Sequence, residues 1–521
     1  MTKPEPLSFD SALAHLCSDE WAPSGTHVAT RHSDEVLRAL LPASRTDAGR
    51  ATLGAAPRAI EHLVCIFKDP LIFHEQNGEL AIRVLRNVCA RSVANQGRTA
   101  QYGAHDLVLD CIAKRFDFCD NEAAAGDHTA LRRVEDDGLE DHGRMRLPFF
   151  GFAVEFLVNF VTCNVDNAEL VWRKAFPGIL GKLLECDNHA AASAAAALVH
   201  NCIAIVPDRM KDIVKIWSNP GDGNQSLTRS LVAQMKNSEE NGKQHEKFMW
   251  SFMIIRRLIG ASFLENSFEA LGPSLDRIAS SSTGFSEHQE TFLQILEAAA
   301  SKSAEVPNET EDDTAELVIP ENSLAFFAEL FEAAMLKSHA EILRTTGSII
   351  GSVIIVSEDS AKLDVLRMRS VKVAISVLHA ISGGEGNVGT SATSLGGEEL
   401  ARIDNAVVLS GLRGIMVRTI AICCDMSKAA QDSVRKLQGI PPVLSALSYE
   451  KDSSKNPFLR EWAILAVRNL TLGNKENAQE ISGYELAGVQ NDSELLHKTG
   501  LEAYMDEKTG RPKLRVKRTP A

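Results

Sequence analysis

The segment FLVNFVTCNVDNAELVWRKAFPGIL (residues 156–180) combines two features that decide the fold of this 521-residue chain. It begins with the pattern apolar, any residue, asparagine, apolar (residues 157–160), inside an apolar run that is typical of a buried helix. It ends with Pro177 and Gly178, which mark a sharp turn before a new helix. The segment therefore predicts one unit of a helical repeat.

The asparagine pattern recurs along the chain, and its four asparagines are Asn87, Asn159, Asn201 and Asn469. Asn159 and Asn201 are 42 residues apart, which is the period of armadillo and HEAT repeats. A unit of two or three helices cannot bury its apolar face alone, so such units stack. The sequence therefore predicts an all-α, armadillo/HEAT-like superhelix with a concave groove.

Composition agrees with a helical fold and argues against one class of partner. Apolar residues make up 44% of the chain and aromatic residues only 6%, which favours packed helices over a β-sandwich. The net charge of −14 repels phosphate backbones. We therefore expect no nucleic-acid partner, although a basic tail (residues 508–518) leaves room for a docking peptide or a weak anionic contact.

Three stretches lack apolar periodicity, and we expect loops or disordered insertions there: residues 120–144, 301–317 and 383–399. They divide the chain into a weakly ordered region at 1–50, N-terminal repeats at 51–300, a helical middle at 318–400, a C-terminal domain at 401–490 and a basic tail at 491–521.

We expect a cytoplasmic protein. Its first twenty residues do not resemble a signal peptide. The apolar stretches 190–206 and 345–356 are polar or short enough to predict buried helices, so we expect no membrane span. The ten cysteines form no C-x-x-C motif, and reduced thiols in a cytoplasmic protein are the natural interpretation.

A family resemblance is carried by the run NPFLREWAILAVRNLTLGNKENAQEI (residues 456–481). This run resembles the C-terminal domain of the ataxin-10 family, some fungal members of which carry a copper-transport name. The motif positions are Asn456, Pro457, Phe458, Arg460, Glu461, Trp462, Arg468, Asn469 and Leu470. At residues 419–424 the chain reads TIAICC, where the family usually has a Gly-Asn-Leu-Cys-like step. The resemblance implies an armadillo-like fold and a role in regulating cytokinesis.

Sequence motifs for chemistry are weak throughout. The G-x-G-x-x-G match at residues 384–389 lacks a following helix, so we expect a linker and no dinucleotide cofactor. The histidines form no H-E-x-x-H pair, and the adjacent Cys423 and Cys424 are expected to be buried thiols, so we predict no metal site. No nucleophile elbow or P-loop occurs, and we assign no catalytic residue.

Two interpretations of the repeated asparagines remain open. In armadillo proteins such an asparagine binds the main chain of an extended ligand, because an amide both donates and accepts hydrogen bonds. Alternatively, each one satisfies neighbouring backbone within the stack. We favour a non-enzymatic scaffold that binds proteins of unknown identity, and a second copy of the chain is one candidate partner. The alternative is an enzyme or a copper-related metal-handling protein with a site in residues 210–400.

Overall fold

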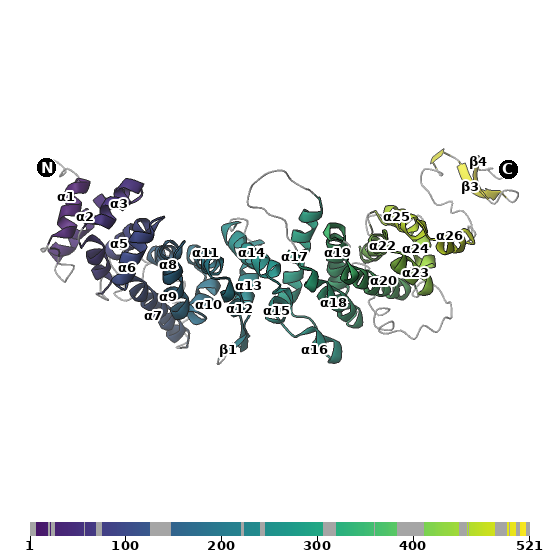
Figure 1. The fold of residues 1–521 in the computed structure, drawn as a ribbon, viewed down its shortest axis with the longest axis horizontal. Helices are drawn as coiled ribbons and strands as arrows, with labels where there is room; N and C mark the ends of the chain where they lie inside the picture. The colour runs from purple at the N-terminus through teal and green to yellow at the C-terminus, as the bar shows by residue number, and fades with distance from the viewer. Residues whose placement is uncertain are drawn as a thin grey trace. The chain divides into compact units, whose positions relative to one another are not determined.

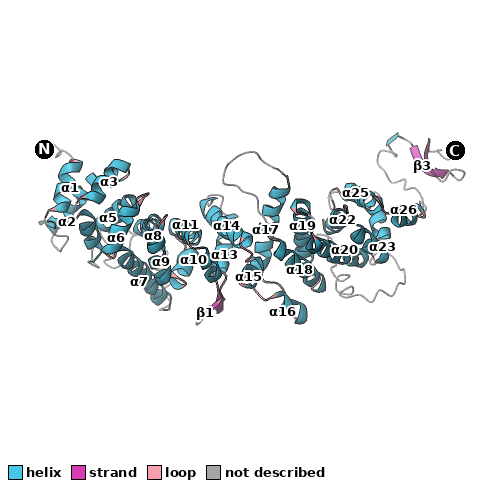
Figure 2. Ribbon diagram, in the orientation of Figure 1, coloured by secondary structure: helices cyan, strands magenta, loops and turns pink. Residues whose placement is uncertain are grey.

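The computed structural model describes most of the chain and divides it into two units. The described residues are 7–18, 21, 27–56, 58–68, 76–124, 147–219, 223–239, 245–305, 319–358, 360–382, 411–447, 456, 458–484, 498–499, 501–506 and 511–516. Unit 1 comprises Met1–Ile295 and Asp312–Ser323, and unit 2 comprises Leu296–Glu311 and Leu324–Ala521. Helices dominate both units (Figure 2), which confirms the predicted all-α repeat fold.

Unit 1 is built from helices of different lengths and one short β-hairpin. Its elements are α1 (Phe9–Cys17), α2 (His27–Ser44), α3 (Asp47–Ala55), α4 (Ala59–Cys65), η1 (Ile66–Lys68), α5 (Gln76–Cys89), α6 (Val93–Gln101), α7 (Ala104–Ala124), α8 (Leu147–Val161), α9 (Val165–Ala175), α10 (Gly178–Glu185), α11 (His189–Ile205), η3 (Pro207–Arg209), α12 (Met210–Ile213), β1 (Trp217–Asn219), β2 (Gly223–Gln225), α13 (Leu227–Glu239), α14 (His245–Gly260), α15 (Leu264–Glu269), α16 (Leu275–Ser280), the first part of α17 (Glu287–Glu305) and η4 (Glu321–Ser323).

Long helices of unit 1 pack against one another in the order of the chain. α5 packs on α8, α8 on α11, and α11 on α14, in chain order (Figure 1). Phe156 and Phe160 of α8 are fully buried between these layers. The 190–206 stretch belongs to α11, whose buried alanines bring the neighbouring helices close. It is thus a buried helix, as the sequence predicts, and α10 begins at Gly178, after the predicted turn.

Unit 2 repeats this arrangement. It contains the rest of α17, α18 (Leu324–Leu336), α19 (Ala340–Val356), α20 (Ala361–Ser382), α22 (Leu412–Cys423), α23 (Lys428–Lys436), α24 (Ile440–Ser445), α25 (Leu459–Thr471), α26 (Lys475–Ser482), β3 (Leu501–Asp506) and β4 (Arg511–Val516). Here α19, α22 and α25 stack in order. Gly347 of α19 faces α22 so closely that an added Cβ would lie 2.9 Å from Ile415 Cγ2.

Polar side chains begin the short helices of both units. Asn164 Oδ1 accepts the backbone N–H of Asn167 at the start of α9, and Asn474 Oδ1 accepts that of Asn477 at the start of α26, each at 3.1 Å. Ser92 and Ser427 cap α6 and α23 in the same way. These caps satisfy N–H groups that a helix leaves without an internal partner, and they fix where each short helix begins.

Two regions differ from the sequence analysis. Within residues 1–50 the structure places α1, α2 and the start of α3, and the buried Val36, Leu37 and Leu40 hold α2 in the stack. Within the basic tail, β3 and β4 form an antiparallel hairpin in which Leu501 faces Val516. Arg515 pairs with Glu502 at 2.6 Å across these strands. Each strand is only six residues long, and so short an alternation of apolar and polar residues does not by itself predict a strand.

Most of the predicted insertions lie outside the described residues. The beginning of the 120–144 stretch is the end of α7, and the beginning of the 301–317 stretch is the end of α17. The 383–399 linker falls entirely outside the described part of the chain. Across the part that is described, no helix is both long enough and apolar enough to cross a membrane.

Candidate protein-interaction surface

A turn residue with positive φ gives the repeats of α5, α8, α22 and α25 a common register. In the repeats of α5, α8 and α25 this residue follows the asparagine by four positions: Arg91 (φ 56°), Cys163 (φ 58°) and Gly473 (φ 72°). Met426 (φ 54°) is the equivalent residue after α22. The position of the asparagine is therefore taken by Ile422 in α22, within the TIAICC stretch that departs from the family pattern.

Each predicted asparagine donates its side-chain N–H to the preceding repeat. Asn159 Nδ2 donates to the main-chain oxygen of Arg86 at 2.9 Å, and Asn469 Nδ2 donates to that of Ala421 at the same distance. Arg86 and Ala421 occupy equivalent positions, so these two bonds are the same contact made in both units. Asn201 donates to Thr162 Oγ1 at 3.0 Å, and Asn87 donates to Ser44 Oγ at 2.9 Å.

The four asparagines differ in how far they open to solvent. Asn87 and Asn469 are buried, whereas Asn159 and Asn201 are half-buried. Asn469 Oδ1 has no hydrogen-bond partner among the described residues. The amide N–H groups thus join successive layers, and a role of the four side chains in ligand binding stays a prediction that rests mainly on the half-buried pair.

Two glutamines that the sequence analysis did not single out make a stronger contact between layers. Gln96 Nε2 donates to the main-chain oxygens of Cys89, Asn159 and Thr162 at 2.8–3.2 Å. In unit 2, Gln431 Nε2 donates to the equivalent oxygens of Cys424, Asn469 and Leu472. Each glutamine lies four residues after a serine cap, at Ser92 and Ser427, and this spacing is the sequence signal that identifies it.

A second set of asparagines closes the ends of the long helices. Asn95, Asn167 and Asn477 each donate Nδ2 to a main-chain oxygen seven residues earlier, at 2.9–3.0 Å. Those oxygens lie in the last turn of a helix, where carbonyl groups lack an internal partner. The asparagines satisfy the end of each long helix and fix the turn that follows it.

Arginine–aromatic pairs line the same long helices. Arg83 of α5 stacks over Phe152 of α8, with 4.9 Å between the guanidinium carbon and the ring centroid. Arg418 of α22 stacks over Trp462 of α25 at 5.4 Å. Each arginine lies four residues before the asparagine position of its own helix. Each ring lies seven residues before the asparagine of the next long helix. The pair is therefore a repeated feature of the two units.

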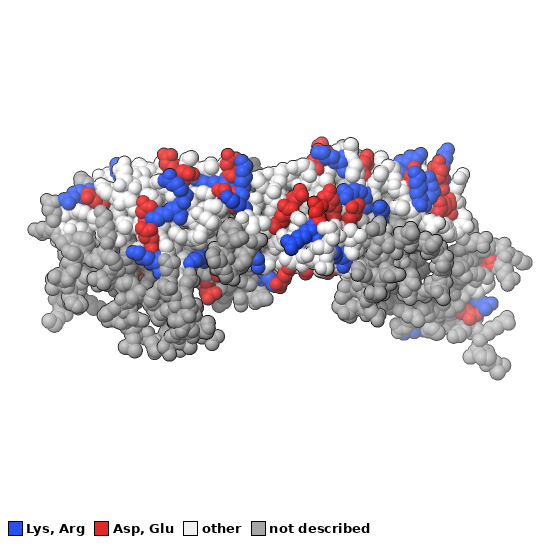
Figure 3. Space-filling view, turned by 90° about the horizontal axis from the view of Figure 1, so that it is seen from below, with Lys and Arg blue, Asp and Glu red and all other residues white. Residues whose placement is uncertain are grey.

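Carboxylates accompany the arginines of unit 1. Glu79 pairs with Arg83 at 3.2 Å, and Glu155 pairs with Arg86. In unit 2, Arg344 of α19 pairs with Glu297 and Glu341, and these bonds raise its pKa above the ordinary range. Positive and negative side chains alternate over the described part of the face in Figure 3. This face thus has no field of a single sign that would attract a polyanion.

The residues of the family motif are partly packed and partly exposed. Asn456 Oδ1 accepts the backbone N–H of Gly414 at 3.2 Å and so ties the entry of α25 to α22. Leu470 is fully buried, whereas Arg460, Glu461 and Arg468 are exposed. Phe458 adopts φ 62° and is 69% exposed, and Pro457 lies outside the described residues. The Trp462 ring is half-buried beneath Arg418.

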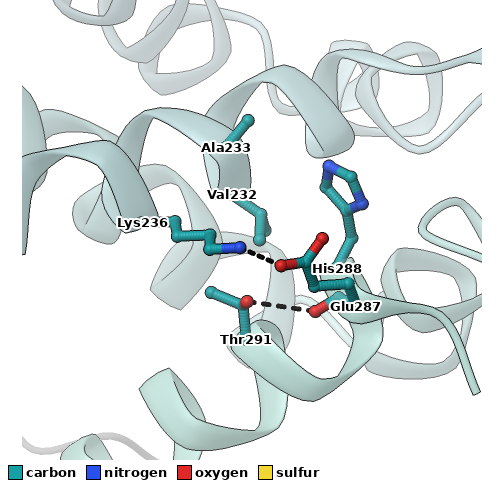
Figure 4. A pocket seen from close by; sticks show the side chains of 6 residues that line it. All are labelled: Val232, Ala233, Lys236, Glu287, His288 and Thr291. Atoms are coloured by element: carbon teal, nitrogen blue, oxygen red, sulfur yellow. Dashed lines mark hydrogen bonds and ion pairs between the residues drawn. The ribbon is translucent and has the colours of Figure 1, made fainter.

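A cavity in unit 1 offers little chemistry. A cavity of about 200 Å³ lies between α13 and α17 in unit 1 (Figure 4). Lys236 and Glu287, which line it, form an ion pair, and Thr291 Oγ1 donates to the Glu287 main-chain oxygen. Desolvation and the charge of Arg229 lower the pKa of His288, so its imidazole is neutral at pH 7. No nucleophile with an adjacent base lines this cavity.

Metal-binding groups are dispersed in the part of the chain that is described. No three of its His, Cys, Asp and Glu side chains are close enough to share a metal ion. Cys423 and Cys424 are fully buried in α22 and its cap, as the sequence predicts. Burial raises the pKa of the Cys423 thiol to about 12.

Comparison with known proteins points to one family. Residues 412–515 match the family described as the spinocerebellar ataxia type 10 protein domain. The chain is 24% identical to ataxin-10 of Bos taurus over 442 residues, covering 81% of this chain and 78% of that protein. An ataxin-10 homolog of Schizosaccharomyces pombe is 34% identical over 110 residues, covering 21% of this chain and 24% of that protein. Among solved structures, an engineered protein aligns with 89% of this chain and 88% of its own, with a TM-score of 0.37 and 13% identity.

Proposed function

The chain belongs to the ataxin-10 family, and we propose that it is a non-catalytic cytoplasmic scaffold that binds other proteins and takes part in regulating cytokinesis. The observation that carries the proposal is the repeated brace between layers. Gln96 and Gln431 each donate to two carbonyl oxygens of the next repeat and to one at the end of their own repeat's long helix. A stack braced in this way holds a surface ready for a partner, which reduces the ordering that binding requires.

The half-buried asparagines are the proposed contacts on that surface. Asn159 and Asn201 use Nδ2 within the stack, and the Asn201 side chain also forms a hydrogen bond with His200, so the carbonyl oxygen of Asn159 is the first group offered to a ligand. An amide oxygen accepts a hydrogen bond from any peptide N–H, whatever the side chains of the ligand. Asn87 and Asn469 make equivalent internal contacts but are buried, and they are therefore matched controls.

Affinity purification from dividing cells tests the proposal. Full-length protein is compared with the Asn159→Ala, Asn201→Ala double variant and with the Asn87→Ala, Asn469→Ala double variant. We expect the first variant to lose partners that the second retains. Equal loss in both variants would attribute the effect to weakened stacking, and unchanged partner sets would remove the asparagines from the proposal.

Two further measurements test the role in cytokinesis and the self-association of the chain. Cells depleted of the protein should accumulate binucleate cells, and the wild-type chain should restore division while the Asn159→Ala, Asn201→Ala variant should not. Normal division after depletion would refute the cytokinesis role. Sedimentation velocity of the purified chain shows whether its partners include a second copy.

A further inference from the structure

Arg418 occupies a site built by three helices of unit 2. Its guanidinium stacks over the Trp462 ring of α25 at 5.4 Å. Gly351 of α19 is also close, because an added Cβ there would lie 3.2 Å from Arg418 Nη1 and 3.4 Å from Cζ. The glycine therefore leaves space that the guanidinium fills, and the guanidinium contacts both α19 and α25.

Comparison with the equivalent site in unit 1 shows what Arg418 lacks. There, Glu79 lies four residues before Arg83 and pairs with it at 3.2 Å. The residue four before Arg418 is Gly414, which has no side chain to offer. The stacked ring is present in both units, but the carboxylate on the same helix is present only in unit 1.

The second carboxylate of unit 1 is missing as well. Glu155, three residues after Phe152, pairs with Arg86. Three residues after Trp462 the chain has Leu465, and the position of Arg86 is taken by Ala421. Both substitutions replace a charged side chain by an apolar one, so the unit 2 site keeps one cation and none of the anions that balance its counterparts.

No other described residue supplies the missing charge. Neither a hydrogen bond nor an ion pair joins Arg418 to any part of the chain that the structure describes. The field of Glu297 reaches Arg418, but that carboxylate is hydrogen-bonded to Arg344 at 3.2 Å. Desolvation lowers the pKa of Arg418, although a guanidinium remains protonated in proteins. Among the described residues, no carboxylate therefore pairs directly with this partly desolvated cation.

We propose that Arg418 receives an aspartate or glutamate side chain from an acidic segment of a partner protein, which deepens and rests on the scaffold function proposed above. A carboxylate matches the planar fork of guanidinium N–H donors with two parallel hydrogen bonds. One guanidinium balances one carboxylate, whereas phosphorylated motifs are bound by clusters of arginines. Ile355, one turn after Gly351 on α19 and 54% exposed, offers an apolar contact for a neighbouring ligand residue.

A phage-displayed library of random dodecapeptides, selected on the purified full-length protein, supplies the probe. We expect the selected peptides to be enriched in aspartate or glutamate next to an apolar residue. The Arg418→Gln protein should lose this enrichment. Arg83→Gln is the matched control, because the carboxylates around Arg83 belong to the chain itself, and it should retain the enrichment. Absence of acidic enrichment on the wild-type protein would overturn the proposal.

A double-mutant cycle makes the test independent of any folding defect. One selected acidic peptide and its Glu→Gln form are titrated by fluorescence anisotropy against wild-type and Arg418→Gln protein. The peptide change should weaken binding to wild type by about tenfold, as expected for a lost charge-assisted hydrogen bond. It should leave binding to Arg418→Gln unchanged. An equal loss on both proteins contradicts the assignment, as does tighter binding of a phosphoserine form.

The two proposals fail in distinguishable ways. If the wild-type chain captures no partner from dividing cells, the scaffold function itself is refuted. If it captures partners that Arg418→Gln retains in full, and the peptide cycle shows no coupling, only the carboxylate site is refuted.

Discussion

Gln96 and Gln431 make the same three hydrogen bonds in two different units of the chain. In each case the side-chain amide reaches the end of its own repeat's long helix and two carbonyl oxygens of the next repeat. The Oε1 atom of each accepts from an asparagine of the next repeat, Asn164 or Asn474, at 3.1–3.2 Å. One buried side chain therefore joins four backbone or side-chain groups across a layer boundary.

Replacement of either glutamine by alanine should destabilise its own unit. Three carbonyl oxygens lose a donor in a buried setting, which we expect to cost roughly 1–3 kcal/mol. Hydrogen–deuterium exchange is the suitable measurement, because two units need not unfold together. Gln96→Ala should raise exchange in α5 and α8, and Gln431→Ala should raise it in α22 and α25. The exposed Gln101 provides the control, and an equal effect of Gln101→Ala would contradict this account.

The asparagines were predictable from sequence and the glutamines were not, for a physical reason. An asparagine recurs at a fixed place in apolar helices, and the 42 residues between Asn159 and Asn201 match a repeat period, so the pattern is visible. A glutamine in a polar helix such as α6 looks like a surface residue until the next repeat covers it. Its burial is a tertiary effect, and only the Ser-x-x-x-Gln spacing links Gln96 with Gln431.

The missing carboxylates near Arg418 illustrate the same limit. Trp462 stands out in the sequence as part of the family motif, but its partner, Arg418, lies 44 residues earlier on α22. Only the structural register equates Arg418 with Arg83 and Gly414 with Glu79. The missing carboxylate at Gly414 can be recognised only once Glu79 is known to occupy the equivalent position in unit 1.

Acidification should destabilise unit 1 through a buried and a half-buried histidine, His105 and His200. Burial lowers the pKa of His105; the charge of Asp106 opposes this shift and the charge of Lys174 adds to it. Burial also lowers the pKa of His200. Between pH 6.5 and these lowered values the unfolded chain binds more protons, so the free energy of unfolding falls as pH falls through this window. Each pKa unit corresponds to about 1.4 kcal/mol.

Thermal melting between pH 7.5 and 5 measures this effect. His105→Phe keeps a ring against Phe160, on which His105 is stacked at 5.4 Å, and should flatten the dependence. Replacement of the exposed His379 by glutamine should leave it unchanged. A melting temperature that rises on acidification over this range would show that other groups dominate.

The adjacent thiols of α22 should be inert in the folded chain. Only a thiolate reacts rapidly with alkylating agents, and burial raises the pKa of Cys423 to about 12. Iodoacetamide at pH 7.5 should therefore modify the exposed Cys163 within minutes and leave Cys423 and Cys424 unmodified until urea is added. Peptide mass spectrometry resolves the sites. Rapid labelling of Cys423 in the native protein would show that α22 opens readily.

Two glycine-to-alanine changes should shift stability in opposite directions. In a helix interior, alanine is favoured over glycine by about 1 kcal/mol. Gly97 of α6 has nothing within 4 Å of an added Cβ, so Gly97→Ala should raise the melting temperature.

At Gly347 an added Cβ would lie 2.9 Å from Ile415 Cγ2, 3.2 Å from Thr419 Oγ1 and 3.3 Å from Met416 Cε. Relieving these contacts requires α19 and α22 to move apart, at an expected cost of about 1–3 kcal/mol, which exceeds the gain in helix propensity. Gly347→Ala should therefore lower the melting temperature and raise hydrogen exchange in α22, and a stabilised Gly347→Ala protein would show that these helices pack less closely than the structure indicates.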